Sequence, residues 1–368
     1  MSPSLRFPEF TGEWKEERLS EIADIYKGAG ISKDQLSDNG EPCILYGELY
    51  TKYKTETITE VISRTDIDNT KLVRSKANDV IIPCSGETAE DIATARCVIK
   101  DGILLGGDLN IIRLHNYDGS FVSYQLNGKR KYDIAKVAQG VSVVHLYGEH
   151  LKGVKTVNPC LAEQKKISRF LSLLDERIAV QNRLIDRLQS LMIGIAQKIA
   201  HSNKPNVRIS DCLECSSSAL QESEVNKTGK YPVYGANGIV GYIDKYHTQN
   251  EAIYIIKDGS GVGGVSYVTG KCSSTGTLNI LQAKNGHSLK YLYYLLKVFN
   301  FVPYKTGMAI PHIYFKDYGK AKIFCPAYPE QLEYAKLLSS IDGNLRIALD
   351  SLKNFNLQKQ YLLRHMLI

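Results

Sequence analysis

The sequence predicts an α+β protein: two mixed α/β globular regions, related by a pseudo-twofold axis, separated by two long antiparallel coiled-coil helices. Three observations lead to this fold class. The chain repeats itself once, each copy ends in a long segment with heptad spacing of apolar residues, and short strand and helix candidates fill the rest of each copy. A chain of 368 residues has room for two or three domains.

An internal repeat relates the two halves of the chain. A constant offset of 167 residues aligns Gly140 with Gly307, His145 with His312, Tyr147 with Tyr314, Lys155 with Lys322, Pro159 with Pro326, Glu163-Gln164 with Glu330-Gln331, and Asp175 with Asp342. With small gaps, residues 109–112 match 278–281 and residues 18–22 match 208–212. The chain therefore consists of two diverged copies of one unit, each a globular region followed by a long segment.

The long segments have the a/d spacing of a coiled coil. The stripe of the first copy comprises Leu171, Leu174, Ile178, Gln181, Ile185, Leu188, Met192, Ile195 and Ile199, and only Lys359 interrupts the equivalent stripe of the second copy. We expect the first helix to run from about Pro159 to Ala200, with Asn158 as its N-cap. Each narrow stripe needs a partner, and antiparallel packing of the two helices supplies one. The alternative is that each stripe packs on its own globular region.

The globular regions have the patterning of mixed α/β structure. Strands are predicted at residues 43–46, 80–83, 110–114, 252–257, 264–268 and 278–282, and short helices at 121–127 and 289–299. Strands do not alternate with helices of ten or more residues, so a doubly wound parallel sheet is disfavoured.

Composition indicates a chain of the cytoplasm. The N-terminus has no apolar signal segment, and no run of residues is apolar enough to span a membrane. The eight cysteines are scattered singly, which favours a reducing compartment. The formal net charge of +7 is compatible with a nucleic-acid partner without requiring one.

One glycine-rich stretch suggests an enzyme at first sight. Gly259, Gly261 and Gly264 match the dinucleotide-binding pattern G-x-G-x-x-G, but the residues that follow have the pattern of a strand and not of a helix. The pair Cys212 and Cys215 lacks a second ligand pair at zinc-site spacing. His145 and His312 have no nucleophile signature beside them. We therefore expect no catalytic residue, no cofactor site and no metal site on this chain.

Several stretches resemble one known family. Residues 5–25 resemble the N-terminus of specificity subunits of type I restriction-modification enzymes, residues 161–178 and 329–345 are similar to the two spacer helices of that family, and residues 231–246 and 306–317 are similar to parts of its target recognition domains. The resemblance implies target recognition domains at 1–158 and 203–327, a central spacer helix at 159–202 and a distal spacer helix at 328–368.

The resemblance also implies a function. Each recognition domain of such a subunit reads one half of a bipartite, asymmetric site in double-stranded DNA, while the helices set the spacer and dock two methyltransferase subunits. The subunit itself is non-catalytic: S-adenosylmethionine binds to the methyltransferase subunits, and ATP and Mg bind to the restriction subunits, the motor-nucleases of the full complex. Two other functions stay open, a self-contained DNA methyltransferase and a coiled-coil scaffold that ignores DNA.

DNA contacts are expected from loops at equivalent places of the repeat and from nearby cations. The expected contact residues are Ser85, Lys129, Arg130, Lys131, Gly140, Ser142 and His145 in the first copy, and Tyr234, Asn237, Lys257, Ser260, Gly307, Met308, His312 and Lys316 in the second. The alternative is that the glycines only form turns and that the lysines are ordinary surface charges.

Overall fold

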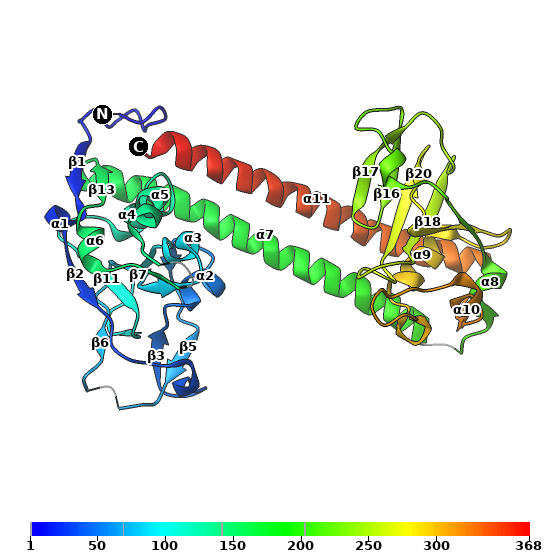
Figure 1. The fold of residues 1–368 in the computed structure, drawn as a ribbon, viewed down its shortest axis with the longest axis horizontal. Helices are drawn as coiled ribbons and strands as arrows, with labels where there is room; N and C mark the ends of the chain where they lie inside the picture. Colours follow the sequence, from blue (N-terminus) through cyan, green and yellow to red (C-terminus); the bar gives the residue numbers. More distant parts are fainter. Residues whose placement is uncertain (1, 69, 141–142, 202–203) are drawn as a thin grey trace. The chain divides into compact units, whose positions relative to one another are not determined.

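A computed structural model describes residues 2–68, 70–140, 143–201 and 204–368 (Figure 1). Unit 1 comprises Met1–Gln181 with Ser351–Ile368, and unit 2 comprises Asn182–Asp350. The two long helices, α7 (Leu161–His201) and α11 (Tyr328–Met366), each contribute to both units. The four-part division expected from the sequence remains a prediction, because the compact units cut across both helices. No described helix combines the length and apolar character needed to cross a membrane.

Unit 1 contains a globular region of short strands and helices. Its elements are β1 (Lys15–Arg18), α1 (Leu19–Ile22), β2 (Ala23–Lys27), η1 (Lys33–Gln35), β3 (Glu41–Ile44), α2 (Glu48–Thr51), β4 (Thr57–Ile58), β5 (Ser63–Thr65), β6 (Val73–Arg74), β7 (Asp79–Pro83), β8 (Ser85–Gly86), α3 (Ala89–Ile92), β9 (Arg96–Val98), β10 (Leu104–Leu105), β11 (Leu109–Leu114), α4 (Gly119–Asn127), α5 (Lys131–Val137), β12 (Val144–His145), α6 (Gly148–Lys152) and β13 (Lys155–Asn158). The sheets have the orders β2-β11-β7-β9-β4, β5-β3-β10-β6, β1-β13 and β12-β8.

Unit 2 contains the corresponding region of the second copy. Its elements are β14 (Val207–Arg208), α8 (Ile209–Cys212), β15 (Leu213–Ser217), η2 (Glu222–Glu224), β16 (Tyr231–Gly235), β17 (Gly238–Ile243), β18 (Glu251–Ile256), β19 (Val265–Thr269), β20 (Ser273–Ser274), β21 (Leu278–Ala283), α9 (Leu289–Lys297), η3 (Val302–Tyr304), α10 (Phe315–Tyr318) and β22 (Lys322–Ile323). The sheets have the orders β15-β21-β18-β19, β17-β16-β20 and β14-β22.

The predicted fold class is confirmed in its parts: two mixed α/β regions and two long helices. Each predicted strand overlaps an observed one, although β3 ends at Ile44 and leaves Tyr46 outside the sheet. Antiparallel pairs dominate, and the parallel pairs are β10 with β3, β4 with β9, and β16 with β20. The three sheets that contain these parallel pairs are thus mixed, whereas β15-β21-β18-β19 is antiparallel throughout, and none of the described sheets is a doubly wound parallel sheet.

The repeat is visible in the strand pairing. Arg18 pairs with Lys155 between β1 and β13, and Arg208 pairs with Lys322 between β14 and β22. In both copies the next strand, β2 or β15, then pairs antiparallel with the LNI strand, β11 or β21. The matches found in the sequence are therefore equivalent positions of one folded unit.

A pair of buried glutamines repeats in the same way. The side-chain oxygen of Gln164 accepts a hydrogen bond from the backbone amide of Asp118 at 2.9 Å, and that of Gln331 accepts one from the amide of Ser288 at 2.8 Å. Asp118 and Ser288 are the N-caps of α4 and α9. Each long helix is thereby joined at its first turn to the short helix of its own copy, because a buried amide side chain must find partners.

The first long helix begins later than expected. Asn158 is the last residue of β13, where it pairs with Lys15, and its side chain donates hydrogen bonds to Glu17 and Thr156. α7 begins at Leu161, where the carbonyl of Cys160 accepts the first hydrogen bonds. Asn158 is thus not the N-cap, since the β1–β13 ladder fixes it as a strand residue.

The heptad stripes are buried or half-buried within the units. In unit 1, Leu171 and Leu174 of α7 share a core cluster with Leu362 and Met366 of α11. The helices run antiparallel there, because Arg177 lies over the ring of Phe355 while Asp175, earlier in α7, contacts a residue later in α11. The same cluster includes residues of the globular region, so the stripe packs on the other helix and on its own domain together.

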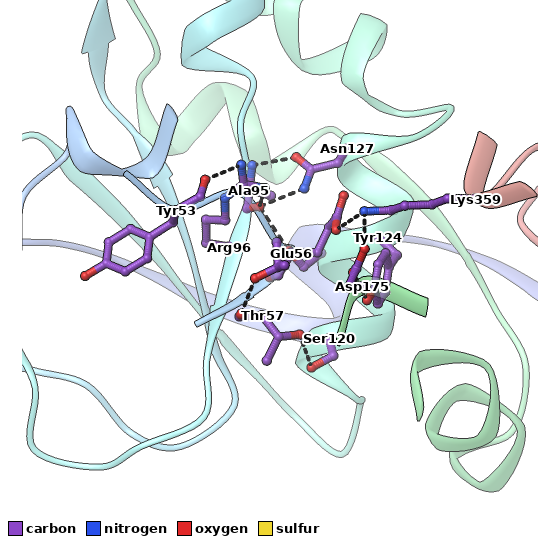
Figure 2. A network of polar contacts seen from close by, with 12 residues as sticks. Tyr53, Glu56, Thr57, Ala95, Arg96, Ser120, Tyr124, Asn127, Asp175 and Lys359 are labelled. Atoms are coloured by element: carbon purple, nitrogen blue, oxygen red, sulfur yellow. Dashed lines mark hydrogen bonds and ion pairs between the residues drawn. The ribbon is translucent and has the colours of Figure 1, made fainter. Parts of the chain in front are cut away.

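Lys359, the interruption in the stripe, is the centre of a buried polar network (Figure 2). Its ammonium group lies 2.8 Å from Glu56 and 2.7 Å from Asp175, and the Tyr124 hydroxyl donates to Asp175 at 2.6 Å. Burial by itself lowers the pKa of Lys359, but Glu56 and Asp175 outweigh it and raise that pKa. Burial raises the pKa of Asp175, and Glu56 adds to the rise. The charged residue thus occupies a core position because two carboxylates neutralise it.

Candidate nucleic-acid interface

In unit 2, the loop 307–312 is a closed turn on the surface. The backbone amides of Thr306 and His312 each donate to the other's carbonyl, at 2.8 and 2.7 Å. Gly307 has φ +84°, and a Cβ there would overlap the carbonyl oxygen of Ile310. Only glycine fits this conformation without strain. The turn holds Met308 and Ile310 outward, with Met308 fully exposed.

The glycine-rich stretch 257–264 lies directly beside this loop. It joins β18 to β19, and it is hydrogen-bonded to the loop from Gly259 to Pro311 at 3.0 Å and from Ile313 to Lys257 at 2.9 Å. A strand and not a helix follows Gly264, so the dinucleotide fingerprint lacks the helix N-terminus that would hold a pyrophosphate. The stretch is the turn of a β-hairpin.

An ion-pair geometry orients the histidine of the loop. His312 Nδ1 lies 2.7 Å from Asp258 Oδ1 of the glycine-rich stretch, and the two residues also form a β-bridge. The second ring nitrogen, Nε2, is the one left for an outside partner. The imidazole stacks on Tyr314 with ring centroids 6.5 Å apart, and the Lys316 ammonium lies 5.3 Å from the Tyr314 ring centre. The hairpin and the loop thus hold Lys257, His312 and Lys316 close together. We call this arrangement of loop, histidine and adjoining segment the loop frame of unit 2.

Unit 1 builds the same frame from different residues. The backbone amides of Gln139 and His145 donate to each other's carbonyls, Gly140 has φ +126°, and His145 stacks on Tyr147 at 6.2 Å. His145 pairs in a β-bridge with Ser85 of β8, in the way that His312 pairs with Asp258. The residues after Ser85 therefore stand where the glycine-rich stretch stands in unit 2. Ser142 lies outside the described residues.

Ser85 itself is buried. Its hydroxyl donates to Asp108 at 3.2 Å, so it supports the β8–β12 pair from inside. A direct DNA contact by this side chain would require the pair to open, since a buried hydroxyl does not reach a ligand.

Lys129, Arg130 and Lys131 form a basic run in unit 1, and carboxylates neutralise part of its charge. Arg130 lies 3.4 Å from Asp133, and Lys131 lies 3.6 Å from Glu90 of α3. Lys129 is exposed. The helix α3 packs against α5, β8 and β12, which places Lys131 of α5 and His145 of β12 on neighbouring elements. Among these three cations, Lys129 is the one best exposed to a phosphate.

Tyr234 and Asn237 lie in a second hairpin of unit 2. Tyr234 packs edge-to-face on Tyr254, with centroids 5.9 Å apart, and burial raises its pKa. Asn237 is exposed in the β16–β17 turn, next to Gly238 with φ +105°. The β16–β17 hairpin belongs to a different sheet from the 257–264 hairpin, so the structure does not join these residues to the His312 cluster.

Three residues of the loop frames are not among those expected from the sequence. Asp258 orients His312, and the tyrosine pair Tyr147 and Tyr314 stacks on the histidines. The repeat aligns Tyr147 with Tyr314, and this match could have identified both tyrosines. The Asp258 contact joins residues 54 positions apart, and no sequence spacing marks it.

Comparison with known proteins agrees with this architecture. The family model described as "Type I restriction modification DNA specificity domain" matches residues 11–190 and 202–354, which is most of the chain. A putative type I restriction enzyme specificity subunit of Haemophilus influenzae is 25% identical over 123 residues, which cover 33% of this chain and 32% of that protein. The MjaVIII specificity subunit of Methanocaldococcus jannaschii is 24% identical over 196 residues, covering 53% of this chain and 43% of that protein. The matched segments thus span less than half the length of these curated relatives.

Solved structures show the same fold. A crystal structure of a type I restriction-modification S subunit from M. genitalium aligns with a TM-score of 0.72 at 18% identity, covering 100% of this chain and 99% of that one. A chain from a study of complex assembly in the type I system aligns with a TM-score of 0.53 at 15% identity, covering 96% of this chain and 97% of that one. The two mixed α/β regions, the two long helices and the family match to both copies lead to one conclusion: the chain belongs to the family of type I restriction-modification DNA specificity proteins.

Proposed function

We propose that this chain is the sequence-reading subunit of a type I restriction-modification complex. Domains 1–158 and 203–327 each read one half of a bipartite, asymmetric site in double-stranded DNA. Helices 159–202 and 328–368 set the spacer between the halves. The observation that carries this proposal is the recurrence of one loop frame in both units, each with a glycine at positive φ and a histidine that stacks on a tyrosine and pairs with a neighbouring segment. Two such frames on one chain can contact two separate DNA segments.

The 307–312 loop has the chemistry of a DNA-contacting surface. Small residues and glycine bring backbone amides close to a phosphate, and a histidine with one nitrogen anchored can donate from the other. Met308 and Ile310 offer apolar contact to thymine methyl groups. Among the residues that the structure describes, Lys305 and Lys316 lie beyond 4 Å of any carboxylate, and both are exposed. Their ammonium groups are therefore available to neutralise phosphates.

The two frames differ at the positions that would read bases. Unit 2 places Lys257, Asp258 and Ser260 beside its loop, while unit 1 places Ser85, Gly86 and Glu87 there. A shared backbone frame with different side chains fits two recognition domains that read different half-sites, since donors and acceptors specify the base. Ser260 is exposed and Ser85 is buried, so we expect the hairpin to contribute more in unit 2.

Apolar residues exposed on the long helices supply docking positions for two methyltransferase subunits. Phe170 and Val180 on α7 are exposed, and so are their repeat equivalents Leu337 and Ile347 on α11. In unit 1, an open groove of 680 Å³ is lined by residues that include Phe170, Leu173, Val180 and Phe355. Contiguous exposed apolar surface is typical of protein interfaces. One equivalent patch per copy supports one methyltransferase subunit per copy.

The remaining assignments follow from family membership. We propose a non-catalytic chain that works in the cytoplasm and binds no cofactor of the reaction. The methyltransferase subunits would bind S-adenosylmethionine, and restriction subunits would bind ATP and Mg. Labelled S-adenosylmethionine tests this directly: the chain alone should transfer no methyl group to DNA, and adding the methyltransferase subunits should produce methylation. Methyl transfer by the chain alone would identify a self-contained methyltransferase.

The loop assignment is tested with Gly307→Ala in the complex with the methyltransferase. The methylated site is first mapped by sequencing, and binding is then measured by fluorescence anisotropy on that duplex. Loss of the contacts that the loop presents should weaken binding by about 5- to 150-fold, which corresponds to about 1–3 kcal/mol. Gly270→Ala is the matched control, because Gly270 also has a positive φ, +79°, but open space at the position of a Cβ.

Binding to duplexes altered in one half-site distinguishes sequence reading by the loops from a scaffold function. Gly307→Ala should reduce discrimination at one half-site and Gly140→Ala at the other. Lys316→Met should lower the slope of log affinity against log salt by about one. Equal binding to all duplexes by the wild-type complex would show that the chain is a scaffold that ignores DNA sequence.

A further inference from the structure

Unit 2 contains a cluster of two cysteines and a histidine that DNA recognition does not use. Cys212 ends α8, His287 directly precedes the N-cap of α9, and Cys325 follows β22 shortly before α11 begins. Their ligand atoms all lie within 4.8 Å of one another. Segments from the beginning, middle and end of the second recognition domain therefore meet at three side chains that ligate soft metals.

The spacing of these atoms fits a tetrahedral zinc site. Zinc binds thiolate sulfur at about 2.3 Å and imidazole nitrogen at about 2.0–2.1 Å, so two such ligands at a tetrahedral angle lie about 3.5–3.6 Å apart. The observed distance from Cys325 Sγ to His287 Nδ1 is 3.5 Å. The cysteines are buried and His287 is partly exposed, which leaves a fourth vertex on the side where water can enter.

The backbone around the cluster is fixed before any ion binds. Asn206 holds both backbone groups of Cys325, accepting from its amide at 2.8 Å and donating to its carbonyl at 2.7 Å. The amide of Lys284 donates to the carbonyl of Cys212 at 2.9 Å, and the amide of His287 donates to the carbonyl of Lys284 at 3.1 Å. Ligands held by such outer contacts lose little freedom when they bind a metal.

The first copy fills the equivalent place without metal ligands. Ile22, Tyr117 and Asn158 occupy the positions of Cys212, His287 and Cys325, and Tyr117 and Asn158 both donate to Glu17, at 2.9 and 3.0 Å. Val207 occupies the place of Glu17 in the second copy. The Glu17 carboxylate therefore joins these positions in unit 1, while the equivalent positions in unit 2 are two cysteines and a histidine, with Val207 in place of Glu17.

We propose that Cys212, His287 and Cys325 bind a zinc ion, with water as the fourth ligand, and that the ion ties α8, the start of α9 and the start of α11 together. The ion would thus join three segments of unit 2 that are far apart in the sequence. Cys215, which completes the C-x-x-C spacing, lies on β15 outside the cluster, which is why the sequence motif alone does not identify the site.

The test uses the untagged full-length chain, purified under reducing conditions. Elemental mass spectrometry should find one zinc ion per chain, and replacing it with Co²⁺ should give thiolate-to-cobalt charge-transfer bands and the intense visible bands of a tetrahedral site. Cys212→Ser combined with Cys325→Ser, and His287→Gln alone, should lose the metal, while the matched control Cys215→Ser should retain it.

Chelation provides a second measurement that does not depend on the variants folding. Removing zinc should lower the temperature at which unit 2 unfolds and leave the fluorescence transition of Trp14 in unit 1 unchanged, because a ligand stabilises the part that binds it. Three results would overturn the proposal: metal-free wild-type protein after dialysis against equimolar zinc, loss of metal in Cys215→Ser equal to that in the double variant, or a Cys212–Cys325 disulfide in the reduced preparation.

Discussion

Replacing Lys359 by Met distinguishes two descriptions of the second long helix. The heptad pattern alone predicts that Met restores the apolar stripe, since Met192 occupies the equivalent position of the first copy. The structure leads to the opposite expectation. Lys359→Met removes the ammonium group that neutralises Glu56 and Asp175, so we expect the variant to be less stable than the wild type.

The size of the effect follows from burial. The side chains of Lys359, Glu56 and Asp175 are 16%, 10% and 7% exposed, so water screens these charges only weakly. Removing one partner of a buried ion pair costs about 3–5 kcal/mol, because the remaining charge stays buried without compensation. Here two carboxylates lose their common partner, and we expect a loss of at least about 3 kcal/mol in the free energy of unfolding of unit 1.

Urea unfolding followed by tryptophan fluorescence measures this loss. Trp14 is the single tryptophan of the chain, and it is buried in the same core cluster as Leu362 and Met366 of α11. Its emission therefore reports on unit 1 alone. Lys353→Met, at an exposed position of the same helix, is the control and should change stability by no more than about 0.5 kcal/mol.

The pH dependence adds a second signature. Burial raises the pKa of Asp175 above 3.8, so the folded state binds a proton there more readily than the unfolded state. Without Lys359 this preference grows, and stability falls as pH rises from the unfolded-state pKa through the higher folded-state pKa. The loss of stability in Lys359→Met should thus be larger at about pH 8 than at about pH 5.

A triple variant completes the test. Glu56→Gln and Asp175→Asn, combined with Lys359→Met, remove all three charges and should recover most of the lost stability. A Lys359→Met variant as stable as the wild type at about pH 8 would contradict the role of Lys359 as the partner of the two carboxylates. A triple variant as unstable as the single one would contradict it as well.

Two further predictions concern the long helices and their junctions. Gly194→Ala and Gly343→Ala should each raise the free energy of unfolding by about 0.5–1 kcal/mol, because both glycines lie inside helices with open space at the Cβ position. Thermal melts measure this change, and a decrease would show that these glycines are needed for close packing. Gln331→Leu should lower the free energy of unfolding of unit 2 by about 1–3 kcal/mol, since the amide of Ser288 and the carbonyl of Pro326 lose their hydrogen-bond partner. The control Gln360→Leu, on the exposed face of α11, should leave that free energy nearly unchanged.

Patterns with a local period could be predicted from the sequence. The heptad stripes, the short helices around Phe121 and Leu289, and the strands on either side of the glycine-rich stretch depend on neighbours a few residues apart. The repeat extended this reach, because two copies of one unit must place equivalent residues in equivalent contacts. It correctly paired the loops that contain Gly140 and Gly307, whereas the contact of the glycine-rich stretch with the second loop is visible only in the structure.

Burial and pairing of individual side chains could not be predicted in this way. Ser85 and Tyr234 were expected as surface residues, and the structure places Ser85 inside and packs Tyr234 on Tyr254. Arg130 and Lys131 were counted as cations for DNA, and both lie close to carboxylates. The exposure of a side chain depends on which helices and strands pack over it. A single sequence does not specify that packing.

By itself, the sequence determined that the chain is a duplicated unit with a long helix in each copy, because duplication and periodicity are properties of residue order. Only the tertiary structure decided what Lys359 and the Cys212, His287 and Cys325 cluster do. Glu56 and Lys359 are 303 residues apart, and the three soft ligands come from three separate segments. Such contacts arise when distant segments fold together, and their energies depend on distance and burial, which residue order does not contain.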